Sequence, residues 1–164
     1  MIKKFFLLLI VAVILSCSSI KKPSYIPLSE IDFADRLDDH LQLVIYYNAL
    51  EVGDGTSYMS AIDIKQSYDY KLFVSTAVLS ENLEILNKLN NLKLDKITKT
   101  DYFLVKALVE IKDKTRILAT YTIAAATKDI IKVNGIYYSH DIKPFFEIVK
   151  KFVPIEARRY YFVP

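Results

Sequence analysis

The stretch 101-DYFLVKALVEIKDKTRILATYTIAAAT-127 contains two runs of β-branched, aliphatic and aromatic residues separated by a short polar break. The first run covers residues 101–112 and the second covers residues 115–127, with Asp113 and Lys114 between them. Val, Ile, Thr, Tyr and Phe favour β-strands, and two such runs joined by a few polar residues favour a hairpin. The stretch therefore predicts an antiparallel strand pair, from which the rest of the fold is built outward.

A second hairpin is predicted directly after this pair. Residues 129–140 read DIIKVNGIYYSH, and the dipeptide Asn134-Gly135 is typical of tight two-residue hairpin turns. The chain ends in ARRYYFVP, residues 157–164, which predicts a short strand at the edge of the sheet. The second half of the chain is therefore expected to form an antiparallel meander.

The first half of the chain carries three more strand-like runs. Residues 41–51 and 57–64 flank the turn sequence GDGT at 53–56, which predicts another hairpin. Residues 68–75 alternate with period two, so that Tyr70 and Leu72 share one face while Lys71 and Phe73 share the other. This third run is expected to be a strand with one buried face.

Helical periodicity marks further segments. In residues 141–153, Asp141 is placed to cap a helix, Pro144 falls in the first turn, and apolar residues recur on one stripe. Residues 81–92 carry leucine at every third position after Ser80, the expected N-cap.

A shorter helix is predicted in residues 29–40, where Ser29 and Asp32 have the spacing of a capping box. The strands and helices together predict an α+β fold: a largely antiparallel sheet of about five to seven strands with two or three helices on one face. Residues 29–164 are expected to form one domain, because no repeat or second core is visible.

The N-terminal residues predict where the protein is located. Lys3 and Lys4 precede an uninterrupted apolar run over residues 5–15, which is typical of an export signal and too short to cross a bilayer comfortably. The following ILSC, ending at Cys17, resembles the lipobox of bacterial lipoproteins. The alternative is an ordinary secretory signal cleaved near Ser16, which would leave a free thiol.

The resemblance to lipoproteins implies a lipid anchor. In that family the signal, here residues 1–16, is removed, and the cysteine becomes an acylated N-terminus, so Cys17 is the expected lipidation site. Residues 17–28 contain two prolines and predict a tether. Ser18 resembles the sorting pattern for the outer membrane facing the periplasm, if the cell has two membranes.

Composition excludes several classes of function. Without residues 1–16 the chain keeps 22 − 2 = 20 basic and 19 acidic residues, whereas a nucleic-acid binder is expected to be strongly basic. The three glycines form no phosphate-binding loop, so nucleotide binding through such a loop is not expected. One cysteine cannot form an intrachain disulfide, and with two histidines it cannot build a Cys/His zinc cluster. No cofactor is therefore predicted.

Two groups of residues could carry chemistry. His140 lies between Ser139 and Asp141, but adjacent side chains diverge, so a surface histidine beside a helix cap is favoured over a catalytic triad. The segment DFADRLDDH collects oxygen and imidazole ligands at positions that match no known metal loop. A solvated acidic face is therefore favoured over a metal site at Asp32, Asp35, Asp38, Asp39 and His40.

Six of the twelve tyrosines occur in three adjacent pairs, at positions 46–47, 137–138 and 160–161. On a strand each pair sends one ring to each face of the sheet. Exposed tyrosines and arginines are typical of protein interfaces, although single exposed aromatic residues are also normal on a surface. The candidate partner surface comprises Tyr47, Tyr138, Arg158, Arg159 and Tyr161.

Three functional hypotheses follow. The favoured one is a non-catalytic envelope lipoprotein that binds another protein, either like an immunity protein or as an accessory subunit of an envelope machine. The second is an envelope hydrolase that uses carboxylates or His140. The third is a lipid-handling lipoprotein, which would need an apolar cavity.

Overall fold

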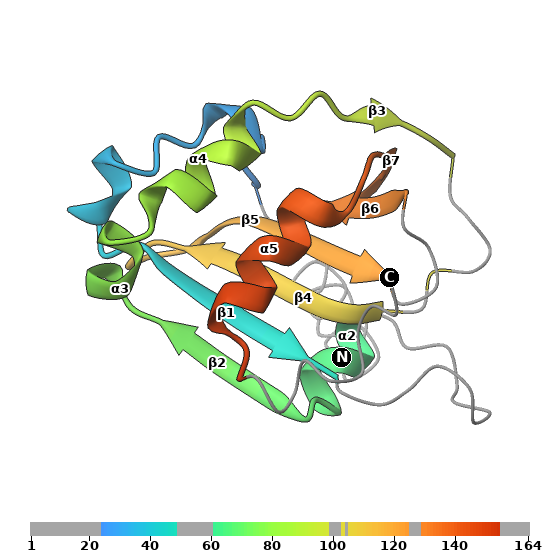
Figure 1. Ribbon diagram of the computed structural model, residues 1–164, viewed down its shortest axis with the longest axis horizontal. Helices are drawn as coiled ribbons and strands as arrows, with labels where there is room; N and C mark the ends of the chain where they lie inside the picture. Colours follow the sequence, from blue (N-terminus) through green and yellow to red (C-terminus); the bar gives the residue numbers. More distant parts are fainter. Residues whose placement is uncertain (1–23, 49–60, 99–102, 104, 125–128, 155–164) are drawn as a thin grey trace, which may run out of the picture.

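The computed structural model describes residues 24–48, 61–98, 103, 105–124 and 129–154. Seven strands form one sheet in the order β2-β1-β4-β5-β6-β7-β3, and each neighbouring pair is antiparallel. Together with the helices this confirms the predicted α+β class (Figure 1). The strands are β1 Gln42–Tyr47, β2 Tyr70–Val74, β3 Asp95–Lys96, β4 Val105–Lys112, β5 Ile117–Ala124, β6 Ile130–Val133 and β7 Ile136–Ser139.

The quoted stretch forms the centre of the sheet. β4 and β5 pair in register with Val109 opposite Tyr121, and β1 lies on the other side of β4 with Ile45 opposite Val109. Long runs of β4 and β5 are buried, which is typical of strands that are covered on both faces. The predicted central hairpin is therefore confirmed.

The β6–β7 hairpin also forms where Asn134-Gly135 predicted it. Both residues have positive φ, 51° for Asn134 and 83° for Gly135, as a type I′ turn requires. β7 then pairs with the two-residue strand β3, which the sequence pattern did not predict. Residues 53–56 and 157–164, expected to form a turn and an edge strand, lie outside the described residues.

Three helices cover one face of the sheet: α3 Thr76–Ser80, α4 Leu83–Asn90 and α5 Lys143–Phe152. Figure 1 shows α5 crossing the sheet from the β6–β7 hairpin toward β2, with α4 alongside. Phe145, Ile148 and Val149 of α5 are buried against the sheet, as the predicted apolar stripe requires. This main core extends from Leu28 to Val153 and so joins both ends of the described chain.

A fourth helix, α2 Ala61–Gln66, belongs to the opposite face. Its Ile64 is buried with Val44 and Tyr46 of β1 and with Val105 and Leu108 of β4. The prediction of a strand over residues 57–64 is therefore wrong in its described part. The strand that pairs with β1 in place of the predicted 57–64 strand is β2. In β2 the predicted alternation of more buried and exposed residues is confirmed.

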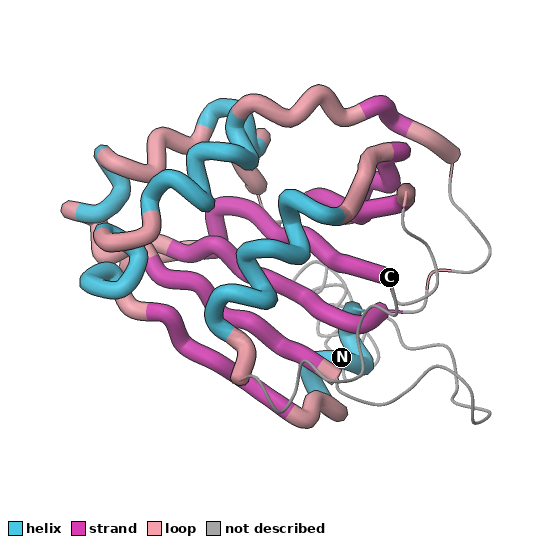
Figure 2. Tube along the Cα trace, in the orientation of Figure 1, coloured by secondary structure: helices cyan, strands magenta, loops and turns pink. Residues whose placement is uncertain are grey.

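Two details of the helices were also predicted wrongly. The segment 29–40 forms two 3-10 turns, Leu28–Glu30 and Asp35–Leu37, because Asp32 Oδ1 accepts the N–H groups of Ala34 and Asp35 and stabilises a turn. Ser80 does not cap α4, because it is the last residue of α3 and its hydroxyl donates to the Ala77 carbonyl. Figure 2 shows these short helical pieces separated by loops.

Candidate functional site

The structure corrects the predicted partner surface at Tyr47. This side chain is only 1% exposed, because it lies on the β1 face that α3, α4 and α5 cover. Its ring packs 6.3 Å from the ring of Tyr70, and burial raises the pKa of its hydroxyl far above the ordinary value. Tyr46 is also buried, on the opposite face, so neither member of this pair is available to a partner.

The other residues predicted for partner binding are only partly described. Tyr138 of β7 is half-buried and packs against the edge of the main core. Arg158, Arg159 and Tyr161 lie outside the described residues, as does the expected lipidation site Cys17. Tyr138 also lines a groove beside the first described residues of the chain.

The Ser139–His140–Asp141 sequence does not form a linked triad. His140 Nδ1 lies 2.7 Å from the backbone carbonyl of Asp141, and its ring packs edge-on to Phe145. The Asp141 carboxylate accepts the N–H of Lys143 at 2.8 Å, at the start of α5. The N-cap residue of α5 is Ile142, so the prediction that Asp141 is the cap is off by one residue, although its carboxylate bonds the first N–H of the helix.

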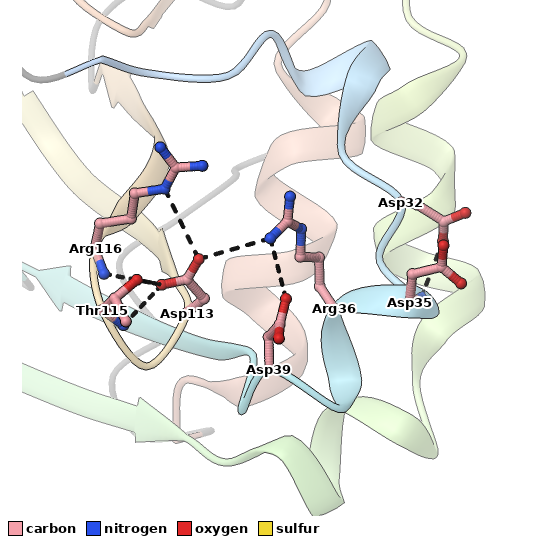
Figure 3. Close-up of polar contacts among 7 residues, drawn as sticks. All are labelled: Asp32, Asp35, Arg36, Asp39, Asp113, Thr115 and Arg116. Atoms are coloured by element: carbon pink, nitrogen blue, oxygen red, sulfur yellow. Dashed lines mark hydrogen bonds and ion pairs between the residues drawn. The ribbon is translucent and has the colours of Figure 1, made fainter.

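The acidic segment 32–40 lies beside the β4–β5 turn, and its Arg36 forms ion pairs with Asp39 and with Asp113 of the turn (Figure 3). Arg36 Nη1 donates to Asp39 Oδ2 at 3.1 Å and lies 3.8 Å from Asp113 Oδ2. The Lys114 N–H donates to the Asp39 carbonyl at 3.0 Å. In the part of the chain that the structure describes, no three His, Cys, Asp or Glu side chains are grouped to hold a metal ion.

Asp113 is the centre of this polar cluster. Its side chain is 7% exposed, and Oδ1 accepts the Thr115 N–H, the Thr115 hydroxyl and the Arg116 N–H at 2.8–2.9 Å. Burial opposes ionisation, but the hydrogen bonds from Thr115 and Arg116 and the charge of Arg116 outweigh it and lower the pKa of Asp113. The cluster therefore joins residues 36–40 to the hairpin turn.

This cluster surrounds a shallow depression of about 590 Å³. Three cations and three carboxylates line it together with His40 and Thr115, so its formal charge balances. The charged side chains at its centre already form ion pairs with one another, so few unpaired charges remain to bind a charged ligand. The lining charges are those of Arg36, Lys114, Arg116, Asp38, Asp39 and Asp113.

The opposite face of the sheet holds the buried polar side chains. Glu110 is buried in β4 and forms an ion pair with Lys65 of α2. The remaining buried polar residues of the described chain are Asn48, Lys106 and Thr122, and the strand register places Thr122 opposite Leu108 on the same face as Glu110. A buried carboxylate needs a partner, and Lys65 supplies it for Glu110. The interior of this face is therefore more polar than the main core.

A second exposed feature lies on the same face, along β2 at the edge of the described sheet. Phe73 is 69% exposed, more than any other large hydrophobic residue described. The Lys71 ammonium lies 5.1 Å from the Phe73 ring centre and 5.2 Å from that of Tyr46. Tyr68 packs edge-on to Tyr46 at 5.6 Å and is itself exposed. We call Tyr68, Lys71 and Phe73 the β2 cluster.

Sequence reasoning did not select the β2 cluster. It assigned Phe73 to the face of residues 68–75 that also carries Asp69, Lys71 and Ser75. An aromatic residue among polar ones on the exposed face of a strand is the signal that could have identified this surface.

Comparison with protein-family models, with curated proteins and with solved structures found no match. Within the described ranges, no helix has the length and hydrophobicity needed to cross a bilayer.

Proposed function

We propose that the protein is a lipid-anchored lipoprotein of the cell envelope that acts as a non-catalytic protein-binding module. The lipobox-like sequence before Cys17 supports the anchor. The exposed β2 cluster supports protein binding, and it is the observation that carries this part of the proposal. The proposed location is the outer membrane, with the domain facing the periplasm.

The β2 cluster has the chemistry that protein interfaces use. A phenylalanine exposed on an edge strand offers a large apolar contact area, and interface cores are enriched in aromatic residues. β2 pairs on one side with β1, and no described strand lies on its other side. An extended segment of a partner could therefore add to the sheet there, with a side chain against Phe73.

Lys71 determines which partner fits. It is exposed as the second residue of β2, and no ion pair joins it to any described residue. A lysine on an edge strand disfavours pairing with an uncharged strand, because its charge would lose water without compensation. We therefore expect the partner segment to carry a carboxylate opposite Lys71 and an apolar residue opposite Phe73.

The tail with Arg158, Arg159 and Tyr161 remains part of the proposed partner surface. α5 crosses the sheet toward β2, so the described chain reaches Pro154 on the β2 side of the molecule (Figure 1). The charges of Arg158 and Arg159 would favour the same acidic partner as Lys71.

A pull-down with matched variants tests the proposal. The tagged full chain is expressed in its own host, or in a related bacterium, and recovered from detergent-solubilised envelopes. We expect the wild type to co-purify a protein partner, and Phe73→Ala to weaken its capture at least about ten-fold, as for an interface hot spot.

Val78→Ala is the control, because Val78 is 41% exposed but lies on α3, outside the β2 cluster. This variant should capture the partner as the wild type does. Recovery of no partner by the wild type, or equal capture by the Phe73 and Val78 variants, would refute the proposed binding surface.

A further inference from the structure

An apolar groove of about 620 Å³ lies where the described chain begins. It runs between residues 24–29, the end of α4 and the β6–β7 turn. Ser24, the first described residue, lines it, together with Leu92, Ile136 and Tyr138. Among the residues that the structure describes, none that lines the groove is charged, although a quarter of the residues in this protein are charged.

The chain is fixed where it passes the groove. The Ile26 N–H donates to the Leu118 carbonyl at 2.7 Å, and Asn134 Nδ2 donates to the Ile26 carbonyl at 3.0 Å. Asn134 Oδ1 in turn accepts the Thr120 N–H at 2.8 Å. The segment is therefore held to β5 and to the β6–β7 turn, and the tether must start beside the groove.

The tether is short. Six residues lie between Cys17 and Ser24, so seven Cα–Cα steps limit the distance between them to about 25 Å. If Cys17 is acylated, the groove lies within this distance of the lipid headgroups. Lys21 and Lys22 of the tether add positive charge that favours an anionic membrane surface.

We infer that this groove is the membrane-facing side of the domain and that its apolar rim rests against the lipid surface. The inference relies on the proposed anchor, goes beyond it by orienting the domain, and commits to a bilayer as the occupant. Ile136 is 38% exposed at the rim, and tyrosines such as Tyr25 and Tyr138 are residues that favour the membrane interface. A tether that starts at the groove brings these side chains to the membrane first.

Tryptophan fluorescence tests this orientation, because the natural chain contains no tryptophan. The variants Ile136→Trp and Val78→Trp each introduce one reporter at similarly exposed positions, the first at the groove and the second on α3. Each full chain is expressed in bacteria and purified from their membranes. It is then reconstituted into phosphatidylcholine and phosphatidylglycerol vesicles with or without brominated acyl chains.

We expect the emission of Ile136→Trp to shift to the blue in vesicles and to lose about half its intensity to brominated lipid, as for a side chain that enters the headgroup boundary. Val78→Trp should change little. Equal quenching of the two reporters, quenching of Val78→Trp alone, or quenching of neither would overturn the inference. If Ile136→Trp does not fold, Tyr138→Trp places a reporter in the same groove.

The test separates this inference from the proposed anchor. Mass spectrometry of the purified protein shows whether Cys17 is acylated. If the thiol is bare, the proposed anchoring fails, and the same thiol can be coupled to a maleimide-headgroup lipid in the vesicles. The two reporters then test the orientation of the groove under an artificial anchor, with the same outcomes for and against.

Discussion

Asp113 connects two parts of the chain that are far apart in the sequence. Its carboxylate accepts three hydrogen bonds from Thr115 and Arg116 and faces the guanidinium of Arg36 (Figure 3). The residue holds the turn of the central hairpin in shape and attaches the N-terminal segment to it. Its lowered pKa follows from these contacts, which favour the ionised form despite burial.

Asp113→Asn should therefore destabilise the protein in a pH-dependent way. At pH 7 we expect a loss of about 1–2 kcal/mol in the free energy of unfolding, as for hydrogen bonds to a charged group. Because the pKa of Asp113 is lower in the folded state, its stabilising effect is complete well above the unfolded value of about 3.9 and declines as the pH falls below it.

Urea unfolding of wild type and variant at several pH values measures this difference. The gap between the two free energies should narrow from pH 6 to pH 3. Asp38→Asn is the control, because Asp38 lines the same depression but is exposed, so its loss should change stability little at pH 7. A gap that stays constant with pH would contradict the role given to the ionised carboxylate.

Tyr47 and Phe73 show how far single residues could be placed from sequence. Residues 42–47 form a nearly continuous apolar run, which indicates a strand buried on both faces, so the burial of both Tyr46 and Tyr47 could have been predicted. Phe73 could be placed on the exposed face by its alternation. Its selection as an interaction site required the exposed fraction of its side chain in the fold and the position of β2 at the edge of the described sheet.

Among the elements, those specified by local chemistry were predicted well. The β4–β5 and β6–β7 hairpins and α5 carry their turn, cap and periodicity signals within a few residues. α2 was missed because Ile62 and Ile64 also fit a strand alternation. Burial of Ile64 against β1 and β4 favours the helix, and this contact with distant strands is not visible in the local sequence.

The β6–β7 turn offers a test of such local chemistry. Gly135 has φ of 83°, and a Cβ there would meet no atom within 4 Å, so any cost of a side chain must come from the backbone. Gly135→Ala should lower the free energy of unfolding by about 1 kcal/mol, because this conformation disfavours alanine.

Gly135→Asn is the matched variant, since asparagine tolerates positive φ better and should cost less than alanine. Thermal or urea unfolding of both variants provides the comparison. Equal or greater loss with asparagine would show that something other than backbone conformation limits this position.

At the scale of the whole molecule, the two proposed contact surfaces lie apart. The tether is fixed to β5 and to the β6–β7 turn, whereas β2 is three strands away from β5, about 14 Å across the sheet. In Figure 1 the first described residues lie at the top and β2 at the bottom. A domain whose groove rests on the membrane would therefore leave the β2 cluster accessible to a partner.

The central claim, a protein-binding domain held at a membrane by its N-terminal cysteine, is tested most directly by intact mass analysis of the protein from fractionated cells. We predict a chain that is found in the membrane fraction, begins at Cys17 and carries the mass of its acyl groups. A chain recovered from the soluble fraction with an unmodified Cys17 thiol would contradict the account.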